Sequence, residues 1–193
     1  MRNDKAPLVM GRKTDNPVSI ADGLAQAATL ASKKGPPPVH LWNPPFCGDI
    51  DMEIRADGTW FYQGTPIGRP AMVRLFASIL KREGDAHFLV TPVEKVGIRV
   101  VDAPFLAVDA DVDPSTGAVT FTTNVGDTVT AGVDNSVTVR GSADAPRPYL
   151  HVRRGLEALI DRKTFYRLAE LATPDDSCRL VLHSDGAIFP LEP

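Results

Sequence analysis

The stretch GDIDMEIRADGTWFY, residues 48–62, decides the fold. Apolar residues occupy every second position from Ile50 to Ile54 and alternate with charged ones. This period of two predicts a half-buried β-strand. The segment 56–58, Ala-Asp-Gly, supplies the chemistry of a tight hairpin turn, and the aromatic segment 59–62 predicts the returning strand. The stretch therefore predicts a β-hairpin.

The chain before this hairpin has a different character. Residues 1–18 mix charged and polar residues with proline without apolar periodicity, which predicts a flexible tail. Apolar residues then recur at helical spacing over 19–35 and predict a helix with Ser19 as its N-cap. The prolines within 36–45 predict an extended surface segment, because proline donates no backbone hydrogen bond.

The chain after the hairpin combines two helices with many short strands. Arg69 and Pro70 begin the first of these two helices. Its single apolar stripe predicts that it runs to a glycine cap at Gly84. Short Thr- and Val-rich segments beyond the turn at 113–117 predict a small curved antiparallel sheet or partial barrel. Strands are predicted at 88–90, 96–101, 105–112, 118–123, 127–131, 136–139, 149–152 and 180–183, and a second helix at 161–172.

An internal repeat organises the chain. Under a constant shift of 93 positions, Ile67, Arg69, Arg74 and Leu75 correspond to Ile160, Arg162, Arg167 and Leu168. Any two amphipathic helices can be aligned over a short window, but here the following strands also keep register without a gap. We therefore predict an α+β fold made of two related domains by duplication. The flexible tail 1–18 precedes domains at 19–101 and 102–193.

Composition narrows the class of protein. The 193 residues carry 21 basic and 24 acidic side chains, a formal charge of −3. No apolar run approaches the roughly 20 residues of a membrane helix, so we expect a cytoplasmic protein without a membrane partner. Segment 100–139 contains no Lys or Arg but six Asp, and a nucleic-acid surface needs a concentrated basic field. Nucleic acid is therefore not an expected partner.

Sequence motifs give no enzymatic signature. The two cysteines and four histidines lack the spacing of metal ligands, and neither a nucleophile elbow nor a phosphate loop occurs. The aspartates at 109, 111 and 113 resemble the start of a calcium loop, but Pro114 stands where that loop requires glycine. We expect no cofactor and favour a protein without catalytic activity.

Several segments resemble the bacterial family called Domain of Unknown Function 1285. They are Leu41–Asp51, Trp60–Tyr62, Gly64–Pro70 and Thr91–Arg99 in the first half, and Pro148–Gly155 in the second. The resemblance implies a duplicated two-domain α+β protein whose C-terminal half looks like a pleckstrin-homology (PH) domain. It also implies a nucleotide-like ligand in the cleft between the domains and a role in signal transduction.

An anionic ligand of this kind needs cationic donors and a flat apolar surface. Arginine suits phosphate and carboxylate because its planar fork donates two parallel hydrogen bonds. Two of the arginines start predicted helices, where backbone amides also face an anion, although pairing with nearby acids would explain them equally well. Trp42 lies among prolines and suits a binding edge or a domain seam. The predicted ligand-binding residues are Trp42, Asp51, Arg69, Glu94, Lys95, Arg99, Arg153, Arg154 and Arg162.

Two other functions compete with ligand binding. Asp49, Asp51 and Glu53 share one face of a predicted strand, which suits a metal-assisted hydrolase, although a solvent-facing strand gives the same pattern. The Thr- and Val-rich strands of the second half could instead pair with a protein partner.

Trp60 and Phe46 could stack on the base of a nucleotide ligand, but the alternating strand favours a core position for Trp60.

Overall fold

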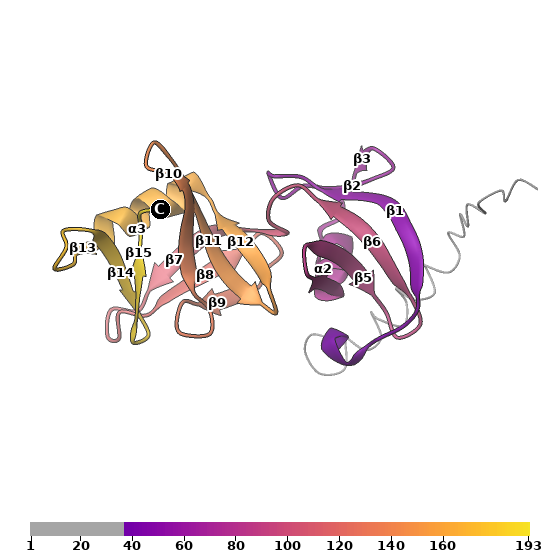
Figure 1. The fold of residues 1–193 in the computed structure, drawn as a ribbon, viewed down its shortest axis with the longest axis horizontal. Coiled ribbons are helices and arrows are strands. Elements are labelled where there is room, and N and C mark those ends of the chain that lie inside the picture. Colours follow the sequence, from indigo (N-terminus) through magenta and orange to yellow (C-terminus); the bar gives the residue numbers. More distant parts are fainter. Residues whose placement is uncertain (1–36) are drawn as a thin grey trace, which may run out of the picture.

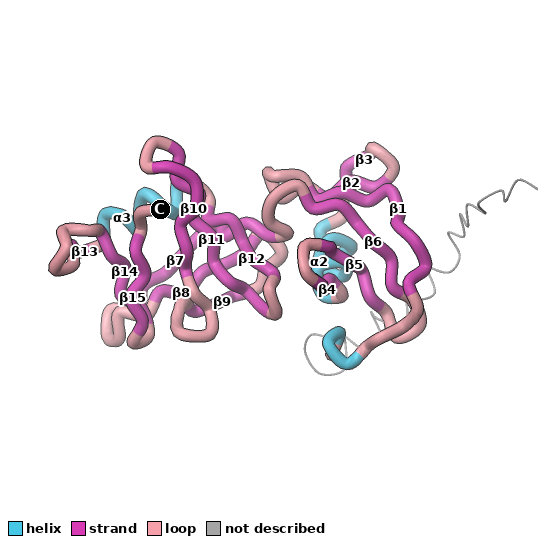
Figure 2. The backbone as a smooth tube through the Cα atoms, in the orientation of Figure 1, coloured by secondary structure: helices cyan, strands magenta, loops and turns pink. Residues whose placement is uncertain are grey.

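The chain folds into two sheet-rich domains in a computed structural model that describes residues 37–193 (Figure 1). The predicted tail at 1–18 and the predicted helix at 19–35 lie outside these residues. Helix is confined to α2 (Pro70–Ser78), α3 (Arg162–Leu171) and the 3₁₀ helix η1 (Val39–Leu41) within the described part (Figure 2). Residues 37–193 are thus mostly β, with less helix than the predicted α+β class, and η1 interrupts the segment predicted to be extended.

The N-terminal domain contains one mixed six-stranded sheet in the order β3-β2-β1-β6-β5-β4. Two three-stranded meanders meet where β1 and β6 pair in parallel, and all other neighbours are antiparallel. The helix α2 connects the two meanders. The strands are β1 (Phe46–Ile54), β2 (Trp60–Tyr62), β3 (Thr65–Pro66), β4 (Leu80–Glu83), β5 (Ala86–Val90) and β6 (Lys95–Val100).

The C-terminal domain repeats this strand order, β9-β8-β7-β12-β11-β10, with β7 and β12 in parallel. Its sheet is therefore mixed, not antiparallel as predicted. A small antiparallel sheet of β13, β14 and β15 follows α3. The strands are β7 (Phe105–Val112), β8 (Val119–Thr123), β9 (Thr128–Thr130), β10 (Val137–Ser142), β11 (Ala145–Arg153), β12 (Leu156–Ile160), β13 (Thr173–Pro174), β14 (Leu180–Ser184) and β15 (Ala187–Pro190).

The two domains are similar in a way that is consistent with duplication. Under the shift of 93 positions, the run α2, β4, β5 corresponds to α3, β13, β14. The six-stranded sheets correspond by a different shift, because α2 lies inside its sheet sequence whereas α3 follows the last strand of its own.

The first helix ends earlier than its apolar stripe predicts. Ser78 is its last residue, and Ile79 leaves helical geometry at φ −105° and ψ 10°. Leu80 then starts a strand, and Gly84, with φ +60°, forms the turn between β4 and β5 instead of a helix cap. Ile79 and Leu80 are nevertheless both buried. The stripe therefore predicted the burial of Ile79 and Leu80 correctly and their secondary structure wrongly, while Met72, also in the stripe, is 40% exposed.

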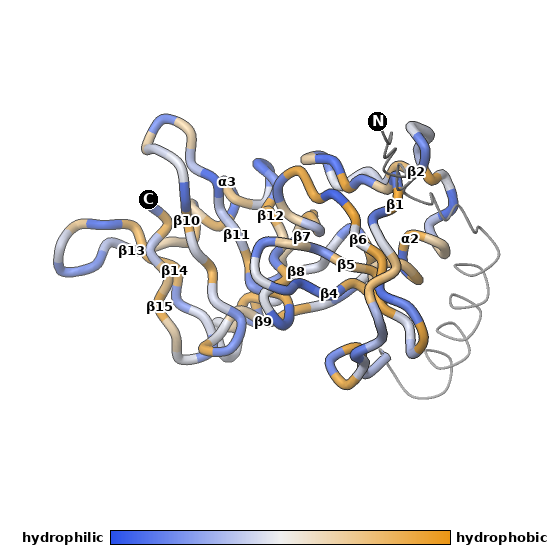
Figure 3. The backbone as a smooth tube through the Cα atoms, turned by 45° about the vertical axis from the view of Figure 1, so that its right-hand side comes forward, coloured by the Kyte–Doolittle hydropathy of each residue, from blue (hydrophilic) through white to orange (hydrophobic). Residues whose placement is uncertain are grey.

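Aromatic residues fill the interior of both domains. Trp60 is 1% exposed and stacks on Phe76 of α2 with ring centroids 6.0 Å apart, so it is a core residue and not a stacking surface. Phe105 and Phe121 are fully buried in the C-terminal sheet. Figure 3 shows that α2 is largely hydrophobic, while the loop between β13 and β14 is hydrophilic.

Candidate anion site between the domains

The domains meet through polar contacts that cross from one to the other. Arg82 of β4 donates to the Gly155 carbonyl at 3.0 Å, and Arg153 of β11 donates to the Ala77 carbonyl of α2 at 3.0 Å. Asn124 donates to the Gly58 carbonyl at 3.4 Å. These bonds join backbone carbonyls of one domain to side chains of the other, so they fix the domains in one arrangement.

The segment that connects the two domains is held in place by hydrogen bonds to Asp102. The Asp102 carboxylate accepts hydrogen bonds from the Tyr149 hydroxyl at 2.7 Å and from Arg147 at 2.5 Å. Burial is the main cause that raises the pKa of Tyr149, and this keeps the phenol protonated as a donor.

A tight hairpin turn between β11 and β12 presents arginine to this join. Arg154 and Gly155 form its two-residue loop, and both have left-handed backbone, with φ of 45° and 76°. Two successive positive φ angles match the type I′ turn that follows the twist of a β-hairpin. Arg154 therefore stands at the tip of the turn, with its side chain outside both strands.

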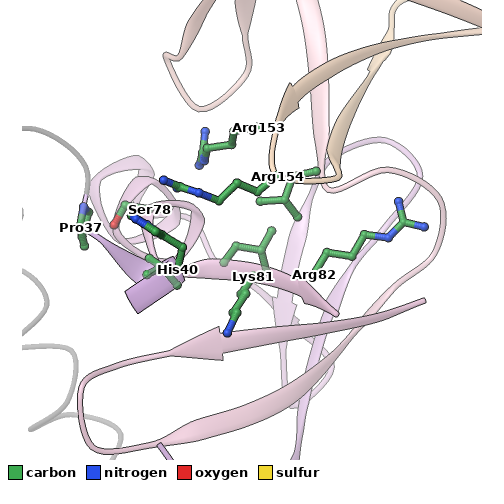
Figure 4. A pocket seen from close by; sticks show the side chains of 10 residues that line it. Pro37, His40, Ser78, Lys81, Arg82, Arg153 and Arg154 are labelled. Atoms are coloured by element: carbon green, nitrogen blue, oxygen red, sulfur yellow. The ribbon is translucent and has the colours of Figure 1, made fainter. Parts of the chain in front are cut away.

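A cavity of about 100 Å³ lies beneath this turn (Figure 4). The Arg153 and Arg154 side chains enter it from the C-terminal domain, near Ser78 at the end of α2, whereas Arg82 points away. Its walls are Pro37, Val39, His40, Ser78, Leu80, Lys81, Arg82, Arg153, Arg154 and Leu156.

The cations at the cavity differ in how far they are already neutralised. Lys81 pairs with Glu83 at 2.9 Å, and Arg153 pairs with Asp127 while lying over the Phe105 ring. Arg154 has no ion pair or hydrogen bond to any of residues 37–193. It is therefore the cation best able to take an external anion.

The remaining predicted residues do not gather at this cavity. Glu94 lies in the turn before β6, where its backbone bonds to Thr91, and Asp51 is exposed on β1. Lys95 pairs with Glu83 at 2.9 Å, and Arg99 pairs with Glu53 at 3.0 Å on the N-terminal sheet.

Trp42 is half-buried beside this region, where its carbonyl accepts a hydrogen bond from Lys81 at 3.4 Å. The indole packs against the hydrophobic core. Trp42 therefore lies next to Lys81, which is one of the cavity residues.

The two helix-start arginines are far from equivalent. Arg69 is the N-cap residue of α2 and makes no capping bond with its side chain. Arg162 bonds to the Tyr166 hydroxyl at 2.9 Å and lines a separate groove of about 440 Å³ within the C-terminal domain. They do not converge, because the two helices occupy different places in the two domains.

Three wall residues with ionisable side chains, His40, Lys81 and Arg82, were not predicted as site residues. Lys81 and Arg82 fall in the segment predicted as helix, so their positions on a strand, from which Arg82 reaches the second domain, were not predicted. The Arg-Gly pair at 154–155 was a usable signal for the turn, since Xaa-Gly pairs favour type I′ hairpins.

The carboxylates considered for metal chemistry are dispersed. No three metal-binding side chains come together within residues 37–193. Glu53 pairs with Arg99 and Arg55, and the Asp49 carboxylate lies across Gly97, where an added Cβ would be 1.9 Å from its Oδ1.

The pKa values of two residues of the N-terminal sheet, Glu83 and His87, are lowered. Hydrogen bonds from Lys95 and then Lys81 hold the pKa of Glu83 below its usual range. Burial lowers the pKa of His87, and the nearby Arg82 lowers it further, so this imidazole favours its neutral form.

Neither helix in the described part of the chain has the length and apolar character needed to span a bilayer.

Comparison with known proteins places the chain in a family. The model of the N-terminal domain of DUF1285, a domain of unknown function, matches residues 37–103, and that of the C-terminal domain matches residues 104–191. A DUF1285 family protein from Silicibacter pomeroyi DSS-3 is 60% identical, covering 88% of this chain and 94% of its own, with a TM-score of 0.80. Another from Shewanella baltica OS155 is 32% identical over 63% of this chain and 91% of its own, with a TM-score of 0.52. A comparison with curated proteins found no match. The chain therefore belongs to the DUF1285 family.

Proposed function

We propose that the protein is a non-enzymatic binding module that holds a small anionic group in the cavity between its two domains. The observation that carries the proposal is Arg154, an arginine without a partner in residues 37–193, at a cavity that Arg153, His40 and Lys81 also line. Guanidinium groups bind phosphate and carboxylate through parallel hydrogen bonds.

The cavity volume limits the ligand. Pockets that enclose a whole drug-sized molecule measure roughly 300–1,000 Å³, whereas this one measures about 100 Å³. It therefore suits one phosphate, sulfate or carboxylate group. A nucleotide would place a phosphate here and leave its base outside, against the surface near Trp42.

A role in signal transduction belongs to the same proposal. The cavity takes walls from both domains, so an anion bound there favours the arrangement in which they are joined. A cytoplasmic location and a PH-like C-terminal domain are further parts of the proposal. The position of α3 after the last strand of the six-stranded sheet supports the latter.

The test is thermal denaturation of the full chain with sulfate, phosphate and a panel of mono- and cyclic dinucleotides. A ligand at about a hundred times its dissociation constant adds about 2.7 kcal/mol to the free energy of unfolding. For a chain of this size, that raises the melting temperature by about 5–10 °C. Arg154→Ala should lose the shift, and Arg162→Ala, whose arginine lines the other groove, should keep it. Absence of a shift with every anion would refute the proposal.

A further inference from the structure

His151 lies at the base of the turn that carries Arg154, and its ring links this turn, through Nε2, to the loop before β10, through Nδ1. The Gly155 amide donates to Nε2 at 3.0 Å, and Nδ1 lies 2.8 Å from the carbonyl oxygen of Asp134. A carbonyl oxygen only accepts, so Nδ1 carries a proton, and Nε2 needs a free lone pair to accept the amide. The two bonds together require a neutral imidazole.

The backbone of His151 is fixed by the two residues that follow Asp134. Asn135 donates to the carbonyls of His151 and Val152, both at 2.9 Å, and the His151 amide donates to the Ser136 carbonyl at 2.9 Å. The imidazole therefore sits on an anchored strand. Protonation at Nε2 would set one N–H against another, and the Gly155 amide would lose its acceptor.

We propose that His151 is the positioning residue of the anion cavity, and that its protonation releases the Arg154–Gly155 turn and weakens anion binding. This inference rests on the proposed function. The same turn supplies the Gly155 carbonyl that accepts from Arg82 across the domain join, so its release also loosens one interdomain bond. The neutral ring therefore supports anion binding, and the protonated ring weakens it.

Charged neighbours of His151 come from its own hairpin, from β4, from β10 and from the loop before β10. Glu157 is its cross-strand partner on β12 and is bound by Arg140, with Arg82 nearby; Arg153 and Arg154 follow on its own hairpin; Asp134 lies in the adjoining loop. Carboxylates and guanidinium groups ordinarily keep their charge between pH 5.5 and 7.5. His40 lines the cavity wall, where a positive charge would strengthen anion binding, opposite in sign to the effect proposed for His151.

The test measures sulfate binding to the full chain by calorimetry at pH 7.5 and pH 5.5, because sulfate keeps its charge throughout. We expect wild-type affinity to fall about tenfold at pH 5.5, the size of effect that the loss of one hydrogen bond produces. His151→Ala should bind about tenfold more weakly at pH 7.5 and lose this decline. His183→Ala, which removes an exposed histidine of β14, should behave as wild type.

Nitrogen NMR of wild-type His151 supplies a readout that needs no ligand and no variant. We expect Nδ1 protonated and Nε2 unprotonated at pH 7.5, with the Gly155 amide resonance moving as the ring titrates. The opposite tautomer, an unresponsive Gly155 amide, or sulfate binding that is equal or tighter at pH 5.5 would overturn the inference. If the NMR signature holds but sulfate binds at neither pH, the anion site is wrong, and with it the assignment of His151 to that site.

Discussion

Replacing Arg153 with methionine tests how the domains are held together. Methionine keeps an apolar stem over Phe105 but removes the guanidinium, which donates to the Ala77 carbonyl at 3.0 Å and pairs with Asp127. A hydrogen bond from a charged donor contributes about 1.5–3 kcal/mol. The ion pair adds at most about 1 kcal/mol, because its side chains are 24% and 38% exposed. We expect the free energy of unfolding to fall by about 2–3 kcal/mol.

Urea denaturation at pH 7.5 measures this loss as a lower midpoint at unchanged slope. Arg154→Met is the matched control, since it makes the same chemical change one residue later, where the side chain has no partner among residues 37–193. Its effect should stay within about 0.5 kcal/mol. A loss below about 0.5 kcal/mol for Arg153→Met, or equal losses for both variants, would refute the assignment of Arg153 as the interdomain tie.

Three further changes test other parts of the fold. Gly58→Ala should destabilise by about 1–2 kcal/mol in urea, because φ is +75° and the new Cβ would lie 2.8 Å from Asn124; an unchanged midpoint would contradict this contact. Asp161→Ala removes the side-chain cap of α3 and should cost about 1 kcal/mol, while Asp161→Asn should cost less. Glu83 has a lowered pKa through Lys95, so its contribution exists above its unfolded pKa and is lost as the pH falls below about 4.5. The stability difference between wild type and Glu83→Gln should therefore shrink from pH 7 to pH 3, and a constant difference would argue against the pairing.

Local sequence patterns correctly predicted elements that are bounded by proline, turn or capping residues. The strand 105–112 coincides with β7, because it is flanked by Pro104 and by the turn that starts at Asp113. The helix predicted at 161–172 matches α3, which Asp161 caps. In both cases the deciding residues are neighbours in the sequence.

Which strands pair with one another was not predicted from the sequence. The strands β3, β12, β13 and β15 were missed, and the end of α2 was misplaced. At that end, the pairing of Lys81 with Phe88 in the β4–β5 hairpin overrides the helical stripe. The parallel pairing of β12 with β7 joins segments about 50 residues apart.

The candidate site was partly predictable for the same reason. Arg153 and Arg154 were predicted from their segment, and they lie at the cavity. Arg69, Arg99 and Arg162 carry the same chemistry, but the sheet topology places them elsewhere. Residue type identifies a cation, whereas only the fold decides whether a carboxylate neutralises it, as Glu53 does for Arg99.

The parallel pair at the centre of each sheet has a consequence for synthesis on the ribosome. The first meander of the N-terminal domain emerges early, but its central neighbour β6 is among the last parts of that domain to be translated. Until then β1 presents an open edge to the cell, and an exposed edge invites pairing with other chains. Nascent chains stalled before residue 95 should consequently be more prone to aggregate than those stalled after the whole domain has emerged.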